Sequence, residues 1–224
     1  MKKKTIIYGN GEFAHHVHQN IIDQGELEIS AFTADRAFIK ERTLRGLPVV
    51  DFEEVEKTYP PGEFSMLVVI AYWRMRNREV MFNKAKAKGY TLENFIGSGV
   101  SLPSDVVMGE NNIISEGVIF GSAGQLGDNN MIRSNTYIGH NFKIHNHCYI
   151  APGCTIGGGS EIKSLSFIGI GTTVVDSITI EQETLVGAGS LVLRNTEPWS
   201  QYFGSPAKKV GEHAETGITF GQRN

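Results

Sequence analysis

Apolar residues recur at every sixth position through the second half of the chain. The run has no exception between residues 96 and 192: Ile96, Leu102, Met108, Ile114, Phe120, Leu126, Ile132, Ile138, Ile144, Ile150, Ile156, Ile162, Ile168, Val174, Ile180, Val186 and Val192. An α-helix returns a side chain to one face about every 3.6 residues and a strand every second residue, so neither element gives this period. The pattern therefore predicts a solenoid of short parallel strands.

Small residues occupy two further positions of the repeat. Where glycine directly follows the apolar residue, we expect a corner with positive φ, which a residue without Cβ adopts freely; these are Gly109, Gly121, Gly127, Gly139, Gly157, Gly169 and Gly187. The residue four after the apolar one is mostly small and also points inward. Cys148 and Cys154 take this position and are expected as buried thiols, not as a disulfide or zinc pair. The two inward positions predict a triangular prism with about 18 residues per coil.

The first ninety residues lack the repeat and alternate between strand and helix patterns. Apolar runs at residues 5–8, 28–33 and 66–71 predict buried strands, and helical patterns follow the first run and cover residues 79–89. Gly9-Asn10-Gly11 stands between the first strand and its helix, where backbone N–H groups and the helix dipole attract anions. The pattern predicts a small Rossmann-like βαβαβ domain with its ligand at the carboxyl ends of the strands.

Candidate ligand-binding residues lie at those strand ends. Asp35 is suited to a ribose or base edge and Tyr72 to stacking on a base. Arg76 stands between Arg74 and Arg78, a pattern that fits either a diphosphate site or a solvated surface. The full set is Gly9, Asn10, Gly11, Asp35, Arg36, Ala71, Tyr72 and Arg76.

Charge and hydropathy exclude some partners. The net charge is −3, with 21 basic and 24 acidic residues, so the chain lacks the basic excess of a nucleic-acid-binding protein. No segment reaches the roughly 18 apolar residues of a membrane span, and the first residues become polar too early for a signal peptide. We therefore expect a cytoplasmic protein without a nucleic-acid or membrane partner.

The densest polar cluster within the repeat runs from residue 139 to residue 147. His140 lies two residues after Ile138, at a corner outside the core, where its side chain can reach a neighbouring cleft. With an ordinary pKa of about 6.5, histidine suits general-base catalysis.

The six-residue pattern resembles the hexapeptide repeat of left-handed parallel β-helix acyltransferases. With the N-terminal turn, it is similar to nucleotide-sugar N-acyltransferases of the bacillosamine, sialic-acid and perosamine pathways. The resemblance implies an α/β plus all-β fold: a nucleotide-sugar-binding domain at residues 1–92, a left-handed β-helix at 93–210 and a loose C-terminal tail at 211–224. It also implies a homotrimer that transfers an acetyl or short acyl group from CoA to a nucleotide-linked amino-deoxy sugar, for lipopolysaccharide or O-antigen synthesis.

The same resemblance assigns roles to individual residues. His140 corresponds to the general base, and Asn141 follows it where well-known members have Glu or Asp to orient the ring. Tyr149 stands where bacillosamine-pathway enzymes have a second histidine, and Lys208 closes a G-x-P-A-K-type segment. The residues implied to bind CoA are Tyr149, Ala151, Gly158, Ile170, Ala188 and Lys208.

Other functions remain open at this point. A sugar O-acetyltransferase would use the same base, and a non-enzymatic scaffold would not need it. A γ-carbonic-anhydrase-like zinc enzyme is suggested by His140 and His145, which have the five-residue spacing of two of its ligands. Catalytic zinc needs a third protein ligand, however, and only His147 remains nearby, so we expect no metal.

One outward column of the predicted prism is apolar throughout. It contains Phe95, Ile113, Met131, Tyr149, Phe167 and Leu185, each just before an inward aliphatic residue. A continuous apolar stripe predicts a covering partner. We expect that partner to be another copy of the chain, with the N-terminal domain or the C-terminal tail as the alternative.

Overall fold

The computed structural model describes residues 3–25 and 27–221. It divides into two compact units. The N-terminal unit comprises residues 1–71 and 80–95, and the C-terminal unit comprises residues 72–79 and 96–224. Helix α3 (Met75–Ala87) begins in the C-terminal unit and ends in the N-terminal unit.

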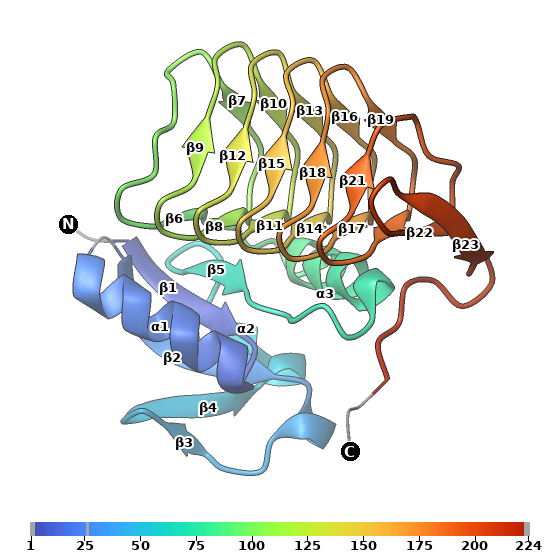
Figure 1. Ribbon diagram of the computed structural model, residues 1–224. Coiled ribbons are helices and arrows are strands. Elements are labelled where there is room, and N and C mark those ends of the chain that lie inside the picture. Colours follow the sequence, from blue (N-terminus) through green and yellow to red (C-terminus); the bar gives the residue numbers. More distant parts are fainter. Residues whose placement is uncertain (1–2, 26, 222–224) are drawn as a thin grey trace. The chain divides into compact units, whose positions relative to one another are not determined.

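The N-terminal unit is built on one sheet with the strand order β3-β4-β2-β1-β5 (Figure 1). Strands β1, β2, β4 and β5 are parallel, as a Rossmann-like domain requires. The strands are β1 (Lys3–Tyr8), β2 (Leu27–Ala34), β3 (Thr43–Leu44), β4 (Leu47–Asp51) and β5 (Ser65–Val68). The helices are α1 (Glu12–Gln24), α2 (Val55–Thr58) and the 3₁₀ turns η1 (Arg36–Phe38) and η2 (Phe52–Glu54).

The hairpin of β3 and β4 is not among the predicted elements. Its two strands are antiparallel and joined by Arg45 and Gly46, whose φ angles are 50° and 79°. Two consecutive positive φ values are typical of the tight hairpin turn that suits the twist of paired strands. The hairpin forms one wall of a pocket described below.

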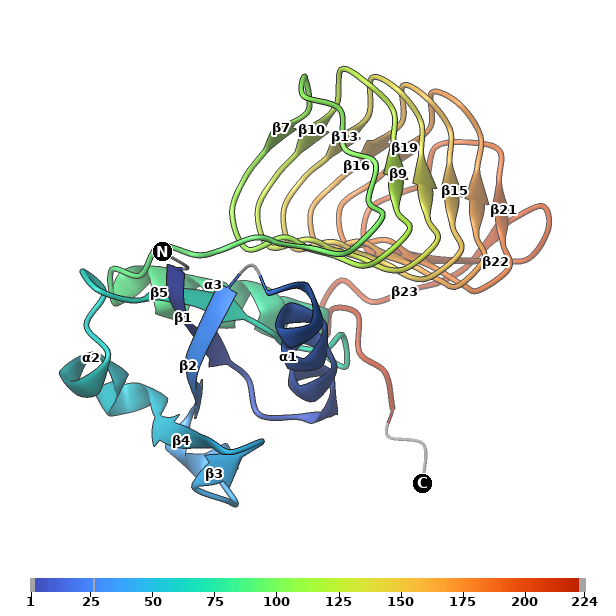
Figure 2. The same cartoon turned by 90° about the vertical axis from the view of Figure 1, so that its left-hand side faces the viewer.

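The C-terminal unit is the predicted prism, with parallel strands stacked in coils on three faces (Figure 2). Each strand pairs with the strand one coil further on, as Gln125 does with Lys143, 18 residues later. The predicted fold class and the 18-residue coil are thus confirmed. We call the faces the β7 face (β7, β10, β13, β16, β19), the β8 face (β6, β8, β11, β14, β17, β20, β22, β23) and the β9 face (β9, β12, β15, β18, β21).

The strands β6–β21 have two residues each, and the second residue is the apolar residue of the repeat; Leu102 is the one repeat residue that lies outside a named strand, and β22 and β23 follow the repeat. They are β6 (Phe95–Ile96), β7 (Val107–Met108), β8 (Ile113–Ile114), β9 (Ile119–Phe120), β10 (Gln125–Leu126), β11 (Met131–Ile132), β12 (Tyr137–Ile138), β13 (Lys143–Ile144), β14 (Tyr149–Ile150), β15 (Thr155–Ile156), β16 (Glu161–Ile162), β17 (Phe167–Ile168), β18 (Thr173–Val174), β19 (Thr179–Ile180), β20 (Leu185–Val186), β21 (Leu191–Val192), β22 (Ser200–Phe203) and β23 (Lys208–Glu212).

The glycines that follow the apolar residues are needed for a different reason from the one predicted. Positive φ occurs two residues later, at positions such as Asn141 (φ 53°) and Gly159 (φ 67°). A Cβ at Gly121 would lie 2.5 Å from the backbone nitrogen of His140, and one at Gly139 would lie 2.5 Å from that of Gly158. The prediction of positive φ at these glycines was wrong, because it is the close approach of the next coil that excludes a side chain.

The apolar stripe on the β8 face is covered within the chain. Tyr149 and Phe167 stack with ring centroids 5.1 Å apart, and Tyr72 packs on them at 4.6 Å and 5.4 Å. Phe220 lies 4.7 Å from Phe167. Tyr72 and Phe220 therefore cover Tyr149 and Phe167. The other four residues of the stripe are buried as well, so the stripe is not a free surface for another copy.

Residues 211–221 belong to the predicted loose tail at 211–224 and make specific contacts, whereas residues 222–224 lie outside the described residues. β23 pairs with β22, His213 is buried, and its Nε2 lies 2.7 Å from the carbonyl oxygen of Glu183. Ile218 is also buried, and its carbonyl accepts a hydrogen bond from the backbone of Met75. These apolar and polar contacts explain why the segment lies against the prism.

A column of corner residues holds the segment 72–79. Arg76 forms a bidentate ion pair with Glu183, at 2.8 Å and 2.9 Å, and the Glu183 carboxylate is 2% exposed. Arg78 is buried and donates to the carbonyl oxygen of Asn129 at 2.7 Å. The Asn129 amide lies 2.9 Å from Nδ1 of His147. This polar network fixes the start of α3 on the prism.

The buried imidazole of His147 makes stability depend on pH. Burial, and then the charge of Arg78, lower the pKa of His147 to about 4. In the unfolded chain the imidazole takes up a proton near pH 6.5, whereas in the folded chain it stays neutral until the pH approaches 4. The free energy of unfolding is therefore unaffected by this group above about pH 6.5 and decreases as the pH falls from 6.5 towards 4. Between pH 6.5 and 4 the free energy of unfolding of the native chain should fall by roughly 2–3 kcal/mol more than that of the His147→Asn variant, which has no imidazole to protonate. Urea unfolding at several pH values measures this difference. Parallel pH profiles of the two chains would contradict this assignment.

Among residues 3–25 and 27–221, every helix is too short or too polar to cross a bilayer.

Candidate functional site

His140 lies at the corner between β12 and β13, where the β9 face turns into the β7 face. Its side chain is exposed, while the core residues Ile138 and Ile144 on either side are buried. Its carbonyl oxygen accepts a hydrogen bond from the backbone of Gly159 at 2.8 Å, which ties the corner to the next coil. The repeat thus holds the backbone rigidly and leaves the imidazole free to meet a ligand.

Two neighbours position the imidazole of His140. Nδ2 of Asn141 lies 3.2 Å from Nδ1 of the ring. On the next coil, Gly158 lies under the ring, since a Cβ at Gly158 would be 2.8 Å from Nε2. Gly158 itself is fixed by its N–H, which donates to Asp176 at 2.7 Å. The absence of a side chain at residue 158 therefore decides where the ring lies.

We expect the Gly158→Ala variant to lower turnover about tenfold or more, because the added methyl group must displace the ring by a substantial fraction of an ångström. Gly158 does not have a positive φ, so alanine fits the backbone and stability should change little. Steady-state kinetics and thermal unfolding, compared with Gly62→Ala, whose added Cβ would meet nothing within 4 Å, separate the two effects. Equal turnover in both variants would contradict this role of Gly158.

The residues expected to bind CoA are distributed over different parts of the prism. Ala151, Ile170 and Ala188 lie at the corner between the β8 and β9 faces, where Ile170 is 61% exposed and Ala151 is buried. A Cβ at Gly169 would be 2.5 Å from the backbone nitrogen of Ala188, so Ile170 and Ala188 belong to successive coils in close contact. Gly158 lies at a different corner, between the β9 and β7 faces, under His140.

Tyr149 and Lys208 are in contrasting surroundings. Tyr149 is 6% exposed under Tyr72, so its ring is occupied by packing and does not face a ligand in this unit. Lys208 is exposed and lines a pocket of about 430 Å³ together with Arg194 and Lys209. Lys209 pairs with Glu197 and Glu212, at 2.6 Å and 2.5 Å. Because Lys209 is already paired with two carboxylates, Arg194 and Lys208 are the cationic groups that this pocket offers to an anionic ligand.

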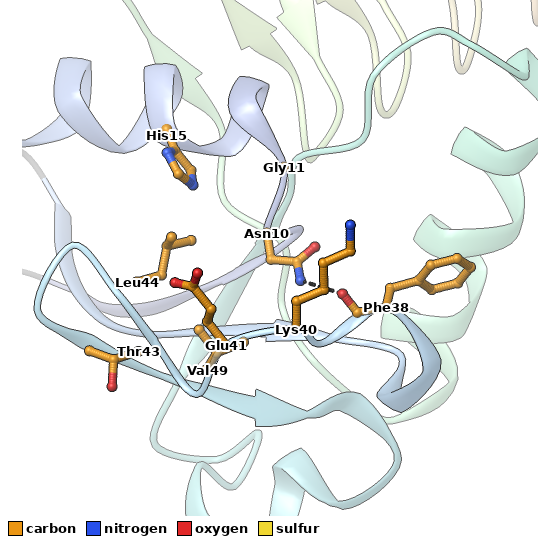
Figure 3. Close-up of a pocket in the computed structure, with 9 residues that line it drawn as sticks. All are labelled: Asn10, Gly11, His15, Phe38, Lys40, Glu41, Thr43, Leu44 and Val49. Carbon is orange, nitrogen blue, oxygen red and sulfur yellow. Dashed lines mark hydrogen bonds between the residues drawn. The ribbon is translucent and has the colours of Figure 1, made fainter. Parts of the chain in front are cut away.

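A second pocket, of about 400 Å³, lies in the N-terminal unit beside the glycine turn (Figure 3). Gly9 has φ 145°, and a Cβ there would lie 2.3 Å from the carbonyl oxygen of Val69. Gly11 precedes α1 and supplies no side-chain cap. The Nδ2 of Asn10 donates to the carbonyl oxygen of Phe38 at 2.9 Å. The lining residues are Asn10, Gly11, His15, Phe38, Lys40, Glu41, Thr43, Leu44 and Val49.

Sequence reasoning found only Asn10 and Gly11 of this lining. The remaining residues come from α1, from η1 and the chain after it, and from the β3–β4 hairpin. The signal for the hairpin was the two-residue turn ending in Gly46, between an apolar strand and a short partner.

Other predicted nucleotide-binding residues have different contacts. Asp35 accepts from the Tyr8 hydroxyl at 2.5 Å and pairs with Lys84 at 2.6 Å. Arg36 pairs with Asp51 at 2.7 Å.

The remaining predicted nucleotide-binding residues are Ala71, Tyr72 and Arg76. They lie at the boundary between the two units or in the C-terminal unit. Ala71 is the last residue of the first segment of the N-terminal unit, and Tyr72 begins the segment of the C-terminal unit. Tyr72 packs on the β8 face and Arg76 is committed to Glu183.

The histidines near residue 140 do not converge. Nε2 of His145 lies 2.6 Å from Glu161, and Nδ1 of His147 faces Asn129. Within residues 3–25 and 27–221, no group of three or more His, Cys, Asp or Glu side chains is arranged to hold a metal ion. The zinc-site geometry considered from the spacing of His140 and His145 is therefore not formed.

Comparison with known protein families gives a match within the prism. Residues 124–158, which include the His140 corner, match the family described as bacterial transferase hexapeptide (six repeats). This stretch carries the bacterial transferase hexapeptide repeat. This confirms the resemblance drawn from the period of the hexapeptide-repeat unit. Comparison with curated protein sequences gives no match.

Solved structures match nearly the whole chain. Perosamine N-acetyltransferase from Caulobacter crescentus, in complex with CoA and GDP-perosamine, is 26% identical, with a TM-score of 0.85 over 93% of this chain and 97% of that one. The acetyltransferase domain of PglB from Neisseria gonorrhoeae is 21% identical, with a TM-score of 0.84 over 93% and 100%. WeeI from Acinetobacter baumannii is 20% identical, with a TM-score of 0.82 over 93% and 100%. The last two support the fold.

Proposed function

We propose that the protein transfers an acetyl group from acetyl-CoA to the amino group of a nucleotide-linked amino-deoxy sugar. The observation that carries this proposal is the match, along almost the full length of both chains, to an N-acetyltransferase that holds CoA and GDP-perosamine. The two units of this chain each supply a pocket, one beside a glycine turn and one with clustered cations. Such products serve the synthesis of surface glycans.

His140 is the general base in this proposal. The sugar nitrogen attacks the thioester carbonyl, a C–N bond forms, the C–S bond breaks, and CoA leaves as a thiolate that takes up a proton. Nε2 of His140 accepts the proton that the nitrogen loses. The attack is direct, without a thioester to a cysteine of the enzyme. Cys148 and Cys154 are buried, and burial raises their pKa values to about 12 and 11, so neither thiol is a nucleophile at neutral pH.

Asn141 sets the tautomer of the base. Nε2 accepts a proton only when the ring proton is on Nδ1, and Nδ1–H then needs an acceptor. Turning the Asn141 amide by 180° exchanges Nδ2 for Oδ1 at the observed separation of 3.2 Å. Asn141 is in this way a positioning residue, although its neutral amide offers no charge to stabilise the imidazolium.

The substrates are assigned to separate units. The glycine turn and the α1 terminus of the N-terminal unit receive the diphosphate, with residues 9–11 as the contact. Lys208 receives a phosphate of CoA, while Gly158, Ile170 and Ala188 line the path of the pantetheine.

The protein acts as a homotrimer in the cytoplasm, where CoA thioesters are made. The support for an assembly is the β9 face beside His140, where Ile119 is 47% and Tyr137 is 45% exposed. A second copy on this face would enclose the corner at which the base lies.

An acetyl-transfer assay tests the function. The chain is incubated with acetyl-CoA and a panel of nucleotide-linked amino sugars, and free thiol release is followed together with the mass of the product. A mass gain of one acetyl group that resists mild base identifies an amide, and a base-labile product identifies an ester and hence O-acylation. Absence of transfer to every amino sugar, with a chain that binds both substrates, would refute the proposal. Light scattering on the same sample reports whether three chains assemble.

A further inference from the structure

The pocket of the N-terminal unit combines an apolar floor with one carboxylate and one ammonium group. Leu44 and Val49 supply apolar surface from the β3–β4 hairpin. Figure 3 shows the Glu41 carboxylate and the His15 ring directed into the same space, with Lys40 rising beside Asn10. A volume of about 400 Å³ is in the range of small-molecule sites, and a flat heterocycle fits such a lining.

Glu41 differs from the other carboxylates around this end of the sheet. Asp35 is used by Tyr8 and Lys84, and Asp51 is used by Arg36 and Arg42. In the part of the chain that the structure describes, Glu41 has no hydrogen-bonding or ion-pairing partner. An ionised carboxylate is an acceptor only, with two oxygens side by side, so it selects a ligand that presents two neighbouring donors.

We infer that the pocket selects a guanine nucleotide, with Glu41 binding the N1–H and 2-amino donors of the base. The inference rests on the proposed function, because it names the nucleotide of the sugar substrate. Guanine presents these two donors together on its Watson–Crick edge, and O6 beside them is an acceptor for Lys40. One carboxylate and one ammonium group thus match three adjacent positions of a single base.

The other bases do not match Glu41 in this way. Uracil and thymine have one N–H between two carbonyl oxygens, and those oxygens would face the carboxylate. Adenine and cytosine have one amino group beside a ring nitrogen that accepts, so one oxygen of Glu41 would be left against a lone pair. A site built around a paired donor rejects analogues that lack it, because its own polar group is then left unpaired.

Calorimetric titration of the full chain with GDP, inosine diphosphate, UDP and dTDP tests the inference. Inosine diphosphate differs from GDP only by the missing 2-amino group. We expect GDP to bind about tenfold more tightly than inosine diphosphate and more tightly still than UDP or dTDP. In Glu41→Gln one acceptor becomes a donor that faces the 2-amino group, so the preference for GDP over inosine diphosphate should disappear. Glu63→Gln, an exposed carboxylate outside the pocket, should retain it.

The outcomes separate this inference from the proposed function. If UDP or dTDP binds as tightly as GDP and its amino sugar is acetylated, the guanine assignment is wrong and the proposed function stands. Equal affinity for GDP and inosine diphosphate in the native chain, or an unchanged preference in Glu41→Gln, also overturns the role of Glu41. If no nucleoside diphosphate binds while acetyl-CoA does, both the inference and the nucleotide part of the proposed function are wrong.

Discussion

The His140→Asn variant is expected to turn over at least about 100-fold more slowly than the native chain, with unchanged affinity for the sugar nucleotide. Asparagine keeps a polar group at the corner but cannot take up a proton at neutral pH, so the amine must lose its proton to water. The exposed imidazole contributes nothing to the core packing of Ile138 and Ile144, so the fold should persist. Steady-state rates of thiol release and calorimetric affinities measure the two expectations.

The control for His140→Asn is His16→Asn, an exposed histidine on α1. Its turnover should equal that of the native chain. Native turnover in His140→Asn, with correct folding shown by an unchanged thermal transition, would remove His140 from the mechanism. A loss of nucleotide affinity equal to the loss of rate would make it a binding residue instead.

The Arg76→Ala variant is expected to lose about 3 kcal/mol of its free energy of unfolding. The substitution removes both hydrogen bonds from the Glu183 carboxylate, which is 2% exposed in the native chain. It also removes the donors to the carbonyl oxygens of Ala214 and Glu215. Denaturant unfolding, followed by circular dichroism, measures the difference.

Two further variants separate the ion pair from general loss of side-chain packing. Adding Glu183→Gln to Arg76→Ala should restore part of the loss, because a buried neutral amide costs less than an unpaired carboxylate. Arg74→Ala, at an exposed neighbouring position, should stay within about 0.5 kcal/mol of the native chain. If Arg76→Ala matched Arg74→Ala, the ion pair would not stabilise the fold.

The interior of the prism was predictable because it depends on a period. One inward aliphatic residue per six defined the strands, the 18-residue pairing and the corner that carries His140, all without knowledge of distant contacts. The glycines after these residues were placed correctly but explained incorrectly. Their need arises from the backbone of the next coil, as at Gly139 under Gly158, and such an approach is visible only in three dimensions.

The surroundings of the prism and the pocket of the N-terminal unit were harder to predict, because they depend on contacts between distant residues. Nothing in the local sequence of Tyr72 or Arg76 distinguishes a ligand contact from packing on Tyr149 or pairing with Glu183. Glu41 lies on a short segment without periodic pattern, and its direction into the pocket is set by the hairpin that follows. The direction of a polar side chain on such a segment depends on tertiary contacts, which local sequence propensities do not predict.

The insertion of residues 72–79 into the C-terminal unit has a consequence for synthesis on the ribosome. The chain passes between the two units three times, after residues 71, 79 and 95, so no single cut separates them into continuous fragments. Met75, which is fully buried, donates to the carbonyl oxygen of Ile218, made 143 residues later. At roughly 5–20 residues per second, the first turn of α3 waits about 7–30 s for its last partner. The N-terminal half therefore leaves the ribosome with an unfinished helix, whose first turn is completed only when Ile218 has emerged.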